Sequence, residues 1–437
     1  LMGTRLHGKA GFADILGQND RIQAYFRLDT LGGGRFDTFK LLETGDIVGI
    51  KGPVFRTKMG EITIAVEDLQ LLTKCLLPFP EKYHGLKDVE TRYRQRYLDL
   101  IVNPEVRKTF IMRSRIISYM RSWLDKREYL EVETPTLQPI YGGALARPFK
   151  THHNYLGMDL YMRIAPELYL KRIAAGGLEK IYEIGKNFRN EDIDAQHNPE
   201  FTTLELYEAY SDYFGMMSLT ESLICDLIKD LIGEYKLPFG EKTIDFTPQW
   251  KRISMADAIL EYGKVEVRKK DKEEVLDMAV QLGVPDVSSD MSKGELIGAI
   301  FDFTVQPHLV NPTFILNHPS EISPLARRLK EDPDFSERFE LFINGWEMAN
   351  AFTELTDPRQ QLENFQSQAE SRAKGNEEAH PVDEDFVTAL ECGLPPTGGL
   401  GIGIDRLVMV LTNSLSIKDV LFFPQMRPRE AEKKEAK

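Results

Sequence analysis

The chain has few cysteines. Only Cys75, Cys225 and Cys392 occur in 437 residues, and they lie far apart, without a CxxC pair or a histidine at metal-ligand spacing. Disulfide frameworks and cysteine-based zinc sites both need repeated or closely spaced cysteines. The sequence therefore argues against both, and we expect the three thiols to be ordinary small hydrophobic residues.

Long apolar runs are also missing. A helix that crosses a membrane needs about 20 predominantly apolar residues, and the sequence contains no such uninterrupted run. The first five residues do not form the charged-then-apolar pattern of a secretory signal. We therefore expect a soluble, cytoplasmic protein with no membrane partner.

Positive charge is in short supply. The formal net charge is −13, whereas a protein that coats nucleic acid non-specifically needs clustered Lys and Arg. Residues 1–77 contain ten Lys or Arg and nine Asp or Glu, a balance of +1 that leaves −14 on the remainder. RNA contacts are therefore expected in the amino-terminal part.

The length predicts at least two domains, because a single hydrophobic core stops growing at roughly 250–300 residues. Residues 12–72 contain short alternating segments separated by turn signals at 32–34 and 59–60, a pattern typical of a small all-β barrel such as an OB-fold. No complete strand is expected before His7, so a first barrel strand or an upstream helix would be missing. We assign residues 1–77 to the barrel, 78–108 to a linker, 109–430 to a second domain and 431–437 to a charged tail.

The second domain has an α+β pattern. Helical spacing over 109–127 is followed by a strand that ends at Pro135, and we interpret this pair as a dimer element. The runs 160–165, 180–188 and 201–209 are expected to be strands of one large antiparallel sheet. Helices are expected over 214–232, over 269–303 with a loop at 283–290, and over 360–376, and the region around 214–310 is interpreted as a helical insertion.

Two segments have the composition of a nucleotide site. Residues 188–191 read Phe-Arg-Asn-Glu, and residues 197–201 read His-Asn-Pro-Glu-Phe. An arginine that ends one strand and an aromatic residue that opens the next would place a cation and a stacking surface across a hairpin, as a nucleoside triphosphate requires.

Near the carboxyl end, residues 398–406 read Gly-Gly-Leu-Gly-Ile-Gly-Ile-Asp-Arg. The repeated glycines let a ligand lie directly on the backbone, and Arg406 at the start of a helix can reach a phosphate. The segment is not the GxGxxG of a dinucleotide fold, because no βαβ unit surrounds it.

Acidic residues lie between these two segments. Glu340 and Glu347 are an odd number of residues apart and would face opposite sides of a plain strand, so a bulge or turn near 344–345 is needed to bring both to one Mg²⁺. Polar groups at Asn350 and Glu354 interrupt an otherwise apolar strand. Buried carboxylates are uncommon without a cationic partner, so these residues suit a cationic ligand.

Together these segments resemble the class II aminoacyl-tRNA synthetases. The helix and strand that end at Pro135 resemble the first, dimer-forming motif of the family, residues 188–205 the second and residues 399–406 the third. Residues 163–169, 197–202, 205–207 and 350–355 resemble the lysine-specific members, and the similarity extends to about Pro428. One departure is Ala351, where the family often has glycine, and its methyl group would either crowd the pocket or point into the core.

The resemblance implies an antiparallel-sheet catalytic domain preceded by an OB-fold barrel. It also implies a homodimer that activates L-lysine with ATP and Mg²⁺ and transfers it to the 3′ end of tRNA(Lys). In the barrel, Phe12 would stack an unpaired anticodon base, Gln23 would read its edge and Glu61 would contribute. A plain alternative is that Phe12 plugs the interior of the barrel.

The resemblance also implies a role for each matching position of the catalytic domain. The residues that would bind lysine are Gly143, Glu167, Arg189, Glu205, Tyr207, Asn350, Phe352 and Glu354. The residues that would bind ATP are Arg189, Glu191, His197, Asn198, Phe201, Glu340, Glu347 and Arg406. The residues that would be catalytic are Arg189 and Arg406 with the Mg²⁺ ligands Glu340 and Glu347.

Within these sets, individual roles follow from the same resemblance. Glu167 would hold the α-amino group of lysine, Arg189 its carboxylate and the α-phosphate of ATP, and Glu354 the ε-ammonium. The adenine would stack between Phe201 and Arg406.

Three other functions share part of this pattern. An aspartyl- or asparaginyl-tRNA synthetase would share the barrel and all three motifs, but its site would need a cation where this chain has Glu205 and Glu354. A lysine-adding protein modifier would lack the barrel. A non-catalytic synthetase-like binding module would have no need of Arg189, Arg406 and two metal ligands together. The sequence therefore favours a lysine–tRNA ligase.

Overall fold

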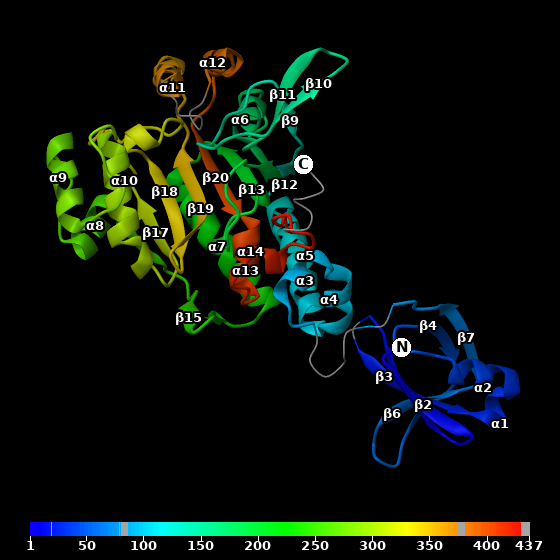
Figure 1. Cartoon of the computed structure of the whole chain (residues 1–437). Helices are drawn as coiled ribbons and strands as arrows, with labels where there is room; N and C mark the ends of the chain where they lie inside the picture. The colour runs from blue at the N-terminus through cyan, green and yellow to red at the C-terminus, as the bar shows by residue number, and fades with distance from the viewer. Residues whose placement is uncertain (19, 78, 80–85, 374–380, 430–437) are drawn as a thin grey trace. The chain divides into compact units, whose positions relative to one another are not determined.

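The structure is a computed structural model, and it describes residues 1–18, 20–77, 79, 86–373 and 381–429. These residues form two compact units, Leu1–Pro104 and Glu105–Lys437 (Figure 1). Residues 78 and 80–85 of the expected linker, and all of the expected charged tail at 431–437, lie outside the described residues. Each unit is described by itself.

The first unit is a small β-structure. Its five-stranded sheet has the order β1-β2-β3-β6-β5, and β4 pairs with β7. The strands are β1 (Gly3–His7), β2 (Ala10–Leu16), β3 (Arg21–Arg27), β4 (Ile47–Lys51), β5 (Val54–Arg56), β6 (Ile62–Val66) and β7 (Asp68–Thr73). The expectation that no complete strand precedes His7 was wrong. Most of β1 is exposed, so no buried apolar face marks it in the sequence, and its backbone pairing with β2 holds it at the sheet edge.

The described residues of the first unit include four helices: α1 (Leu28–Leu31), α2 (Gly33–Lys40), α3 (Val89–Arg94) and α4 (Arg96–Val102). The glycine run predicted as a break contains one true turn, at Gly32 with φ 75°, and α2 begins directly after it. Phe39 of α2 stacks on Phe26 of β3 with 4.2 Å between ring centroids. The helix therefore closes the core of this unit.

The second unit is built on an eight-stranded sheet with the order β16-β17-β18-β19-β20-β13-β12-β8. Its pairs are antiparallel except β16 with β17 and β12 with β8. The strands are β8 (Leu130–Glu131), β12 (Lys180–Phe188), β13 (Glu200–Ala209), β16 (Lys251–Ser254), β17 (Thr313–Leu316), β18 (Arg338–Ile343), β19 (Trp346–Thr353) and β20 (Thr397–Gly403). The predicted strands 180–188 and 201–209 are confirmed as neighbours in this sheet.

The predicted strand 160–165 was wrong. Its first residues belong to β11 (Met158–Met162), which pairs with β10 (Lys150–His153) and β9 (Leu137–Gln138) in a separate three-stranded sheet. Residues 163–165 are buried but not in a strand, because the chain turns there toward α6. A further small hairpin is formed by β14 (Lys236–Phe239) and β15 (Lys242–Asp245).

Helices cover the large sheet. They are α5 (Pro104–Asp125), α6 (Glu167–Ala175), α7 (Tyr213–Leu231), α8 (Met255–Gly263), α9 (Lys272–Leu282), α10 (Lys293–Thr304), α11 (Pro358–Ala373), α12 (Glu384–Glu391), α13 (Ile404–Leu411) and α14 (Ile417–Val420). The expected helices over 214–232 and 269–303 are confirmed, the second as α9 and α10. The expected helix 360–376 is α11, and its residues 374–376 lie outside the described part.

Local sequence explains where several helices begin. Asp271 with Glu274 and Ser292 with Glu295 form capping boxes at the starts of α9 and α10. Figure 1 shows α8 to α10 beside β17, near one end of the sheet. No helix in the described part of the chain is both long and apolar enough to cross a membrane.

Candidate active site

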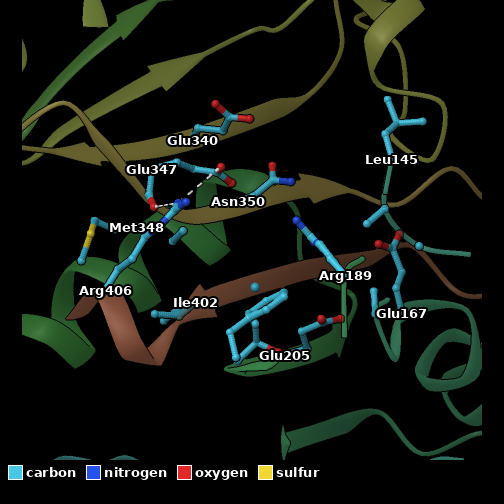
Figure 2. A pocket seen from close by; sticks show the side chains of 18 of the residues that line it. Leu145, Glu167, Arg189, Glu205, Glu340, Glu347, Met348, Asn350, Ile402 and Arg406 are labelled. Carbon is cyan, nitrogen blue, oxygen red and sulfur yellow. Dashed lines mark hydrogen bonds and ion pairs between the residues drawn. The ribbon is translucent and has the colours of Figure 1, made fainter. Parts of the chain in front are cut away.

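A cavity of about 430 Å³ opens on β13, β18, β19 and β20 and is bordered by the first residues of α6 and α13. Every predicted site residue of the catalytic domain except Glu354 lines it. In Figure 2, Arg406 and Glu347 lie at one end, Glu167 lies at the other, and Arg189 lies between them. The sheet therefore brings residues from distant parts of the sequence to one place.

The β18–β19 hairpin positions the two predicted metal ligands. Asn344 and Gly345 have φ angles of 52° and 72° and form its turn, and the register shifts between Leu341 and Phe342. With this bulge, both Glu340 and Glu347 line the cavity. The turn and the irregularity lie where the spacing of the two glutamates required them.

The charged form of Glu347 is disfavoured in the free protein. Burial raises the pKa of Glu347, and the negative charge of Glu340 raises it further. No group of three or more His, Cys, Asp or Glu with a metal-binding arrangement occurs in the described residues. Glu340 and Glu347 are two carboxylates that line the same cavity. Mg²⁺ is commonly held by one or two carboxylates together with substrate phosphates, so the pair fits that ion.

Arg189 is a half-buried arginine, and the charges of Glu191, Glu347 and Glu205 favour its protonated form. It follows β12, and its backbone N–H donates to Pro199 O at 2.8 Å. Its guanidinium lies 5.0 Å from the ring centroid of Phe201, and its buried Nε has no hydrogen-bond partner among the described residues. Burial lowers the pKa of Arg189. A guanidinium in this state is suited to an anionic ligand.

Arg406 has fixed partners on two sides. Its Nη1 donates to Glu347 O at 2.6 Å, and its Nη2 lies 3.0 Å from His197 Nε2. Because arginine can only donate, His197 Nε2 accepts, and its Nδ1 then carries the proton toward Asp194 Oδ2 at 2.8 Å. The arginine at the start of α13 is thus held in place at the Glu347 end of the cavity.

The loop between β12 and β13 is held partly by Asn198. Its Nδ2 donates to Glu200 O at 2.6 Å, and its Oδ1 accepts from Gln425 N at 3.2 Å. The side chain of Asn198 is therefore engaged within the protein. Glu191 is exposed on the same loop and lines the cavity.

The opposite end of the cavity is acidic. Glu167 is the first residue of α6, and it is nearly buried against Gly143. Gly143 has φ 90°, and a Cβ there would lie 2.8 Å from Glu167 Cβ. Only glycine leaves both the backbone angle and the space that this glutamate needs.

Glu205 and Tyr207 face the same side of β13, two residues apart. Burial, with the charge of Glu167, raises the pKa of Glu205 to about 8. Burial, with the same charge, also raises the pKa of Tyr207. The carboxylates at this end of the cavity therefore have too few cationic partners to be stable in their ionised forms.

Glu354 lies behind the cavity wall. Its side chain is buried and forms an ion pair with Lys171, while its Oε1 has no hydrogen-bond partner among the described residues. A Cβ at Gly399 would overlap Glu354 Oε1 and would lie 2.8 Å from Tyr207 Cε1. Glu354 Oε1 therefore lies next to Gly399, which forms part of the cavity floor and has no side chain to separate the two.

The sequence interpretation missed two basic residues. Arg338 donates to Asn350 Oδ1 at 3.0 Å, to Glu340 Oε1 at 2.6 Å and to Ser323 Oγ at 3.0 Å, so it joins three walls of the cavity. Lys171 joins Glu167 and Glu354. The only local signal in the sequence was position: Arg338 lies two residues before Glu340, and Lys171 lies four residues after Glu167.

Ala351, the departure from the family pattern, is fully buried in the hydrophobic core. Its methyl group packs with the core residues and does not line the cavity. Of the two alternatives left by the sequence, the core position is the one observed.

The first unit carries an aromatic face. Phe12 and Tyr25 are paired across β2 and β3 with 4.7 Å between ring centroids, and Tyr25 meets Phe55 at 6.4 Å. Phe12 is on the face opposite to the buried Ala13, so it does not plug the barrel. On the same face as Phe12, Gln23 Nε2 donates to Glu61 Oε2 at 3.0 Å.

Comparison with known proteins agrees with both units. Residues 88–427 match the family described as tRNA synthetases class II (D, K and N), and residues 1–72 match the OB-fold nucleic acid binding domain. The predicted fold class, an α+β class II catalytic domain after an OB-fold barrel, is confirmed.

Relatives are similar over nearly the whole chain. A lysine–tRNA ligase of Syntrophomonas wolfei is 56% identical over 99% of this chain and 88% of its own length. The lysine–tRNA ligase of Bacillus subtilis is 54% identical over 98% and 86%, and lysine–tRNA ligase 2 of Methanosarcina acetivorans is 54% identical over 98% and 84%. These matches confirm the predicted enzyme class, and the chain belongs to the lysine–tRNA ligases of the class II tRNA synthetase family.

Proposed function

We propose that the chain activates L-lysine with ATP and Mg²⁺ and transfers the lysyl group to the 3′ end of tRNA(Lys). One observation supports this most directly. The half-buried guanidinium of Arg189, whose Nε has no hydrogen-bond partner among the described residues, lies between an acidic end, with Glu167 and Glu205, and an end that carries Arg406 and Glu347. An amino acid and a nucleotide that bind at these two ends would have their reacting groups at Arg189.

The chemistry follows from this arrangement. The lysine carboxylate attacks the α-phosphorus of ATP in line, the bond to the β-phosphate oxygen breaks, and pyrophosphate leaves. Arg189 neutralises the attacking carboxylate and the α-phosphate, and Arg406 neutralises charge on the phosphates. The carboxylate is already ionised, so no protein base is needed. Catalysis consists of positioning and charge neutralisation.

Glu340 and Glu347 are the residues that would hold Mg²⁺. The ion, when bound, supplies positive charge to the phosphate oxygens. Arg338 donates to Glu340 at 2.6 Å and so fixes that carboxylate in the hairpin.

Lysine is favoured over acidic or neutral amino acids by charge. Glu205, Glu354 and the hydroxyl of Tyr207 surround the end of the cavity where the side chain would lie. The side-chain carboxylate of aspartate would face the two carboxylates Glu205 and Glu354 there, and like charges at such close range cost several kcal/mol.

The aromatic face of the first unit is the proposed anticodon contact. Phe12, with Tyr25 beside it, offers a stacking surface, and Gln23 offers an amide already oriented by Glu61 and Thr63. Bases stack on such faces in OB-folds, and polar side chains read their edges.

A homodimer and a cytoplasmic location remain part of the proposal. Ile111 of α5 is exposed beside a shallow groove that also includes Tyr119 and Phe422, and Phe423 is exposed next to it. We expect sedimentation at micromolar concentration to give twice the 50.0 kDa chain mass. Sedimentation as a 50.0 kDa species alone would remove the dimer.

The function is tested by charging tRNA(Lys) with radiolabelled lysine in the presence of ATP and Mg²⁺. We expect acid-precipitable label on intact tRNA and none on tRNA whose 3′ end has been oxidised with periodate. Labelling of the oxidised tRNA, or no labelling of either by folded protein, would contradict the proposed transfer.

A further inference from the structure

Lys171 lies directly behind the amino-acid end of the cavity. It is on α6, one turn after Glu167, and its Nζ donates to Glu167 Oε1 at 2.5 Å. The same Nζ forms an ion pair with Glu354 on β19. The side chain is 1% exposed, and Lys171 is not among the described residues that line the cavity. It is therefore a fixed internal cation and not a ligand contact.

The ion pairs of Lys171 occupy one oxygen of Glu167 and one of Glu354, so the other oxygen of each remains available to a ligand. The ammonium group of Lys171 contacts Glu167 Oε1 and Glu354 Oε2. The other oxygen of Glu167, Oε2, is then 3.6 Å from where a Cβ of Gly143 would be, on the cavity side. The other oxygen of Glu354, Oε1, faces Gly399 and has no hydrogen-bond partner among the described residues.

The aromatic surroundings hold Lys171 in the same place. Its Nζ lies 5.1 Å from the ring centroid of Phe352 and 6.0 Å from that of Phe386. Cations are attracted to ring faces at such distances, and a buried ammonium needs this compensation together with its carboxylates.

The charges at this end balance only when Lys171 is counted. Burial raises the pKa of both Glu205 and Glu354 to about 8, and binding of the lysine ammonium groups favours their ionised forms. In that bound state Glu167, Glu205 and Glu354 carry three negative charges, and Lys171 supplies one positive charge. The remaining two negative charges equal the two ammonium groups of a lysine ligand, whose carboxylate is matched by Arg189. Without Lys171 the carboxylates would exceed the ligand's ammonium groups by one.

We propose that Lys171 is a specificity-determining positioning residue: it aligns Glu167 and Glu354 so that one free oxygen of each receives one ammonium group of the substrate. The proposal rests on the proposed function, because it concerns the binding of lysine at that same site. Lys171 would thus link the carboxylate that binds the α-amino group of the substrate to the carboxylate that binds its side chain.

The test is lysine-dependent ATP–pyrophosphate exchange by the full chain with Lys171→Met, a neutral side chain of similar length. We expect the lysine KM to rise by roughly 30-fold or more, since one partner of a buried charge pair is lost, and the ATP KM to stay within about threefold. Lys270→Met is the matched control, because Lys270 also pairs at i,i+4, with Glu274 at 2.7 Å, but is exposed and far from the cavity residues in sequence. Its lysine KM should not change.

Two outcomes would overturn the proposal: an unchanged lysine KM in folded K171M protein, or equal rises in both KM values. Should K171M fail to fold, Lys171→Arg decides, because a planar guanidinium keeps the charge but cannot place it equally on both carboxylates. A rise in lysine KM alone supports the proposal, and an unchanged lysine KM overturns it. Failure of the wild-type chain to exchange with lysine would instead refute the proposed function.

Discussion

At the residue scale, Glu354 is the group on which we expect lysine selectivity to depend most. Its Oε1 is buried without a hydrogen-bond partner among the described residues and faces the cavity floor at Gly399. An unpaired buried carboxylate oxygen is costly unless a ligand satisfies it. The ε-ammonium of lysine is the group that we expect to do so.

The first prediction concerns Glu354→Gln. We expect the lysine KM to rise about 100-fold, because the buried charge pair with the side chain of the substrate is lost together with the internal pair with Lys171. The ATP KM should stay within about threefold, because Glu354 lies at the amino-acid end of the cavity. Steady-state exchange kinetics measure both constants. Glu208→Gln is the control, since Glu208 is on the same strand as Glu205 but pairs with Lys180 away from the cavity. Equal rises in both KM values would exclude Glu354 as the ε-amino partner.

The second prediction is a pH dependence. The pKa of Glu205 is raised to about 8 in the free protein, so below that pH the group is mostly protonated. A lysine ammonium binds the charged form, so binding releases a proton and becomes stronger as pH rises toward 8, by up to about tenfold per unit. Above pH 8 the affinity should level off.

Isothermal titration calorimetry with lysine from pH 6.5 to 8.5 measures this dependence. Glu205→Gln should bind lysine more weakly and with a smaller pH slope. A dissociation constant of the wild-type chain that does not change over this range would refute the role of Glu205.

Residue roles were predictable only in part. Arg189 and Arg406 stand at the ends of recognisable motifs, so resemblance located them. No motif distinguishes Lys171 in the sequence, because a glutamate followed four residues later by a lysine also forms an ordinary ion pair on an exposed helix. Only the fold reveals that its second partner, Glu354, comes from a strand far along the chain.

At the element scale, the β18–β19 hairpin brings the two proposed metal ligands to one cavity although they are seven residues apart in the sequence. The bulge between Leu341 and Phe342 places Glu340 and Glu347 on the same cavity. The odd spacing of the two glutamates predicted this irregularity, because a regular strand would separate them.

The third prediction tests that hairpin. Glu347→Gln should raise the half-saturating Mg²⁺ concentration for exchange by about tenfold or more, because one of two carboxylate ligands is lost. Titration of activity with Mg²⁺ at saturating lysine and ATP measures it. Glu337→Gln, which removes an ion pair with Arg327 just before β18, is the control. An identical Mg²⁺ requirement in wild type and E347Q would rule out Glu347 as a metal ligand.

Other elements show why prediction failed. β11 has the alternating pattern of a sheet strand, but the pattern does not say which sheet it joins, and it pairs with β10 and β9. β1 was missed because an exposed edge strand has no buried face to detect. Long strands such as β12 and β13 were predicted correctly, because their composition and the turn signals that flank them indicate a strand and no other secondary structure.

At the scale of the whole molecule, the residues proposed for lysine activation and those proposed for tRNA binding lie in different units. The second unit holds every residue proposed for activation, and the first holds the aromatic face proposed for the anticodon. Activation should therefore be independent of the first unit, whereas charging of tRNA should need both.

The fourth prediction separates these activities. Phe12→Ala should raise the KM for tRNA(Lys) roughly 5- to 100-fold, since stacking of one base contributes about 1–3 kcal/mol, and should leave ATP–pyrophosphate exchange unchanged. Leu41→Ala, at a residue that is 75% exposed on the same unit, is the control. A normal tRNA KM in F12A would remove Phe12 from the anticodon contact.

Activation of lysine in this cavity is measured by ATP–pyrophosphate exchange with each of the twenty amino acids in turn. We expect rapid exchange with lysine and at most traces with the others. Exchange with aspartate or asparagine would keep the fold and contradict the selectivity assigned to Glu205 and Glu354. No exchange with any amino acid, by folded protein that binds ATP, would contradict the enzymatic function itself.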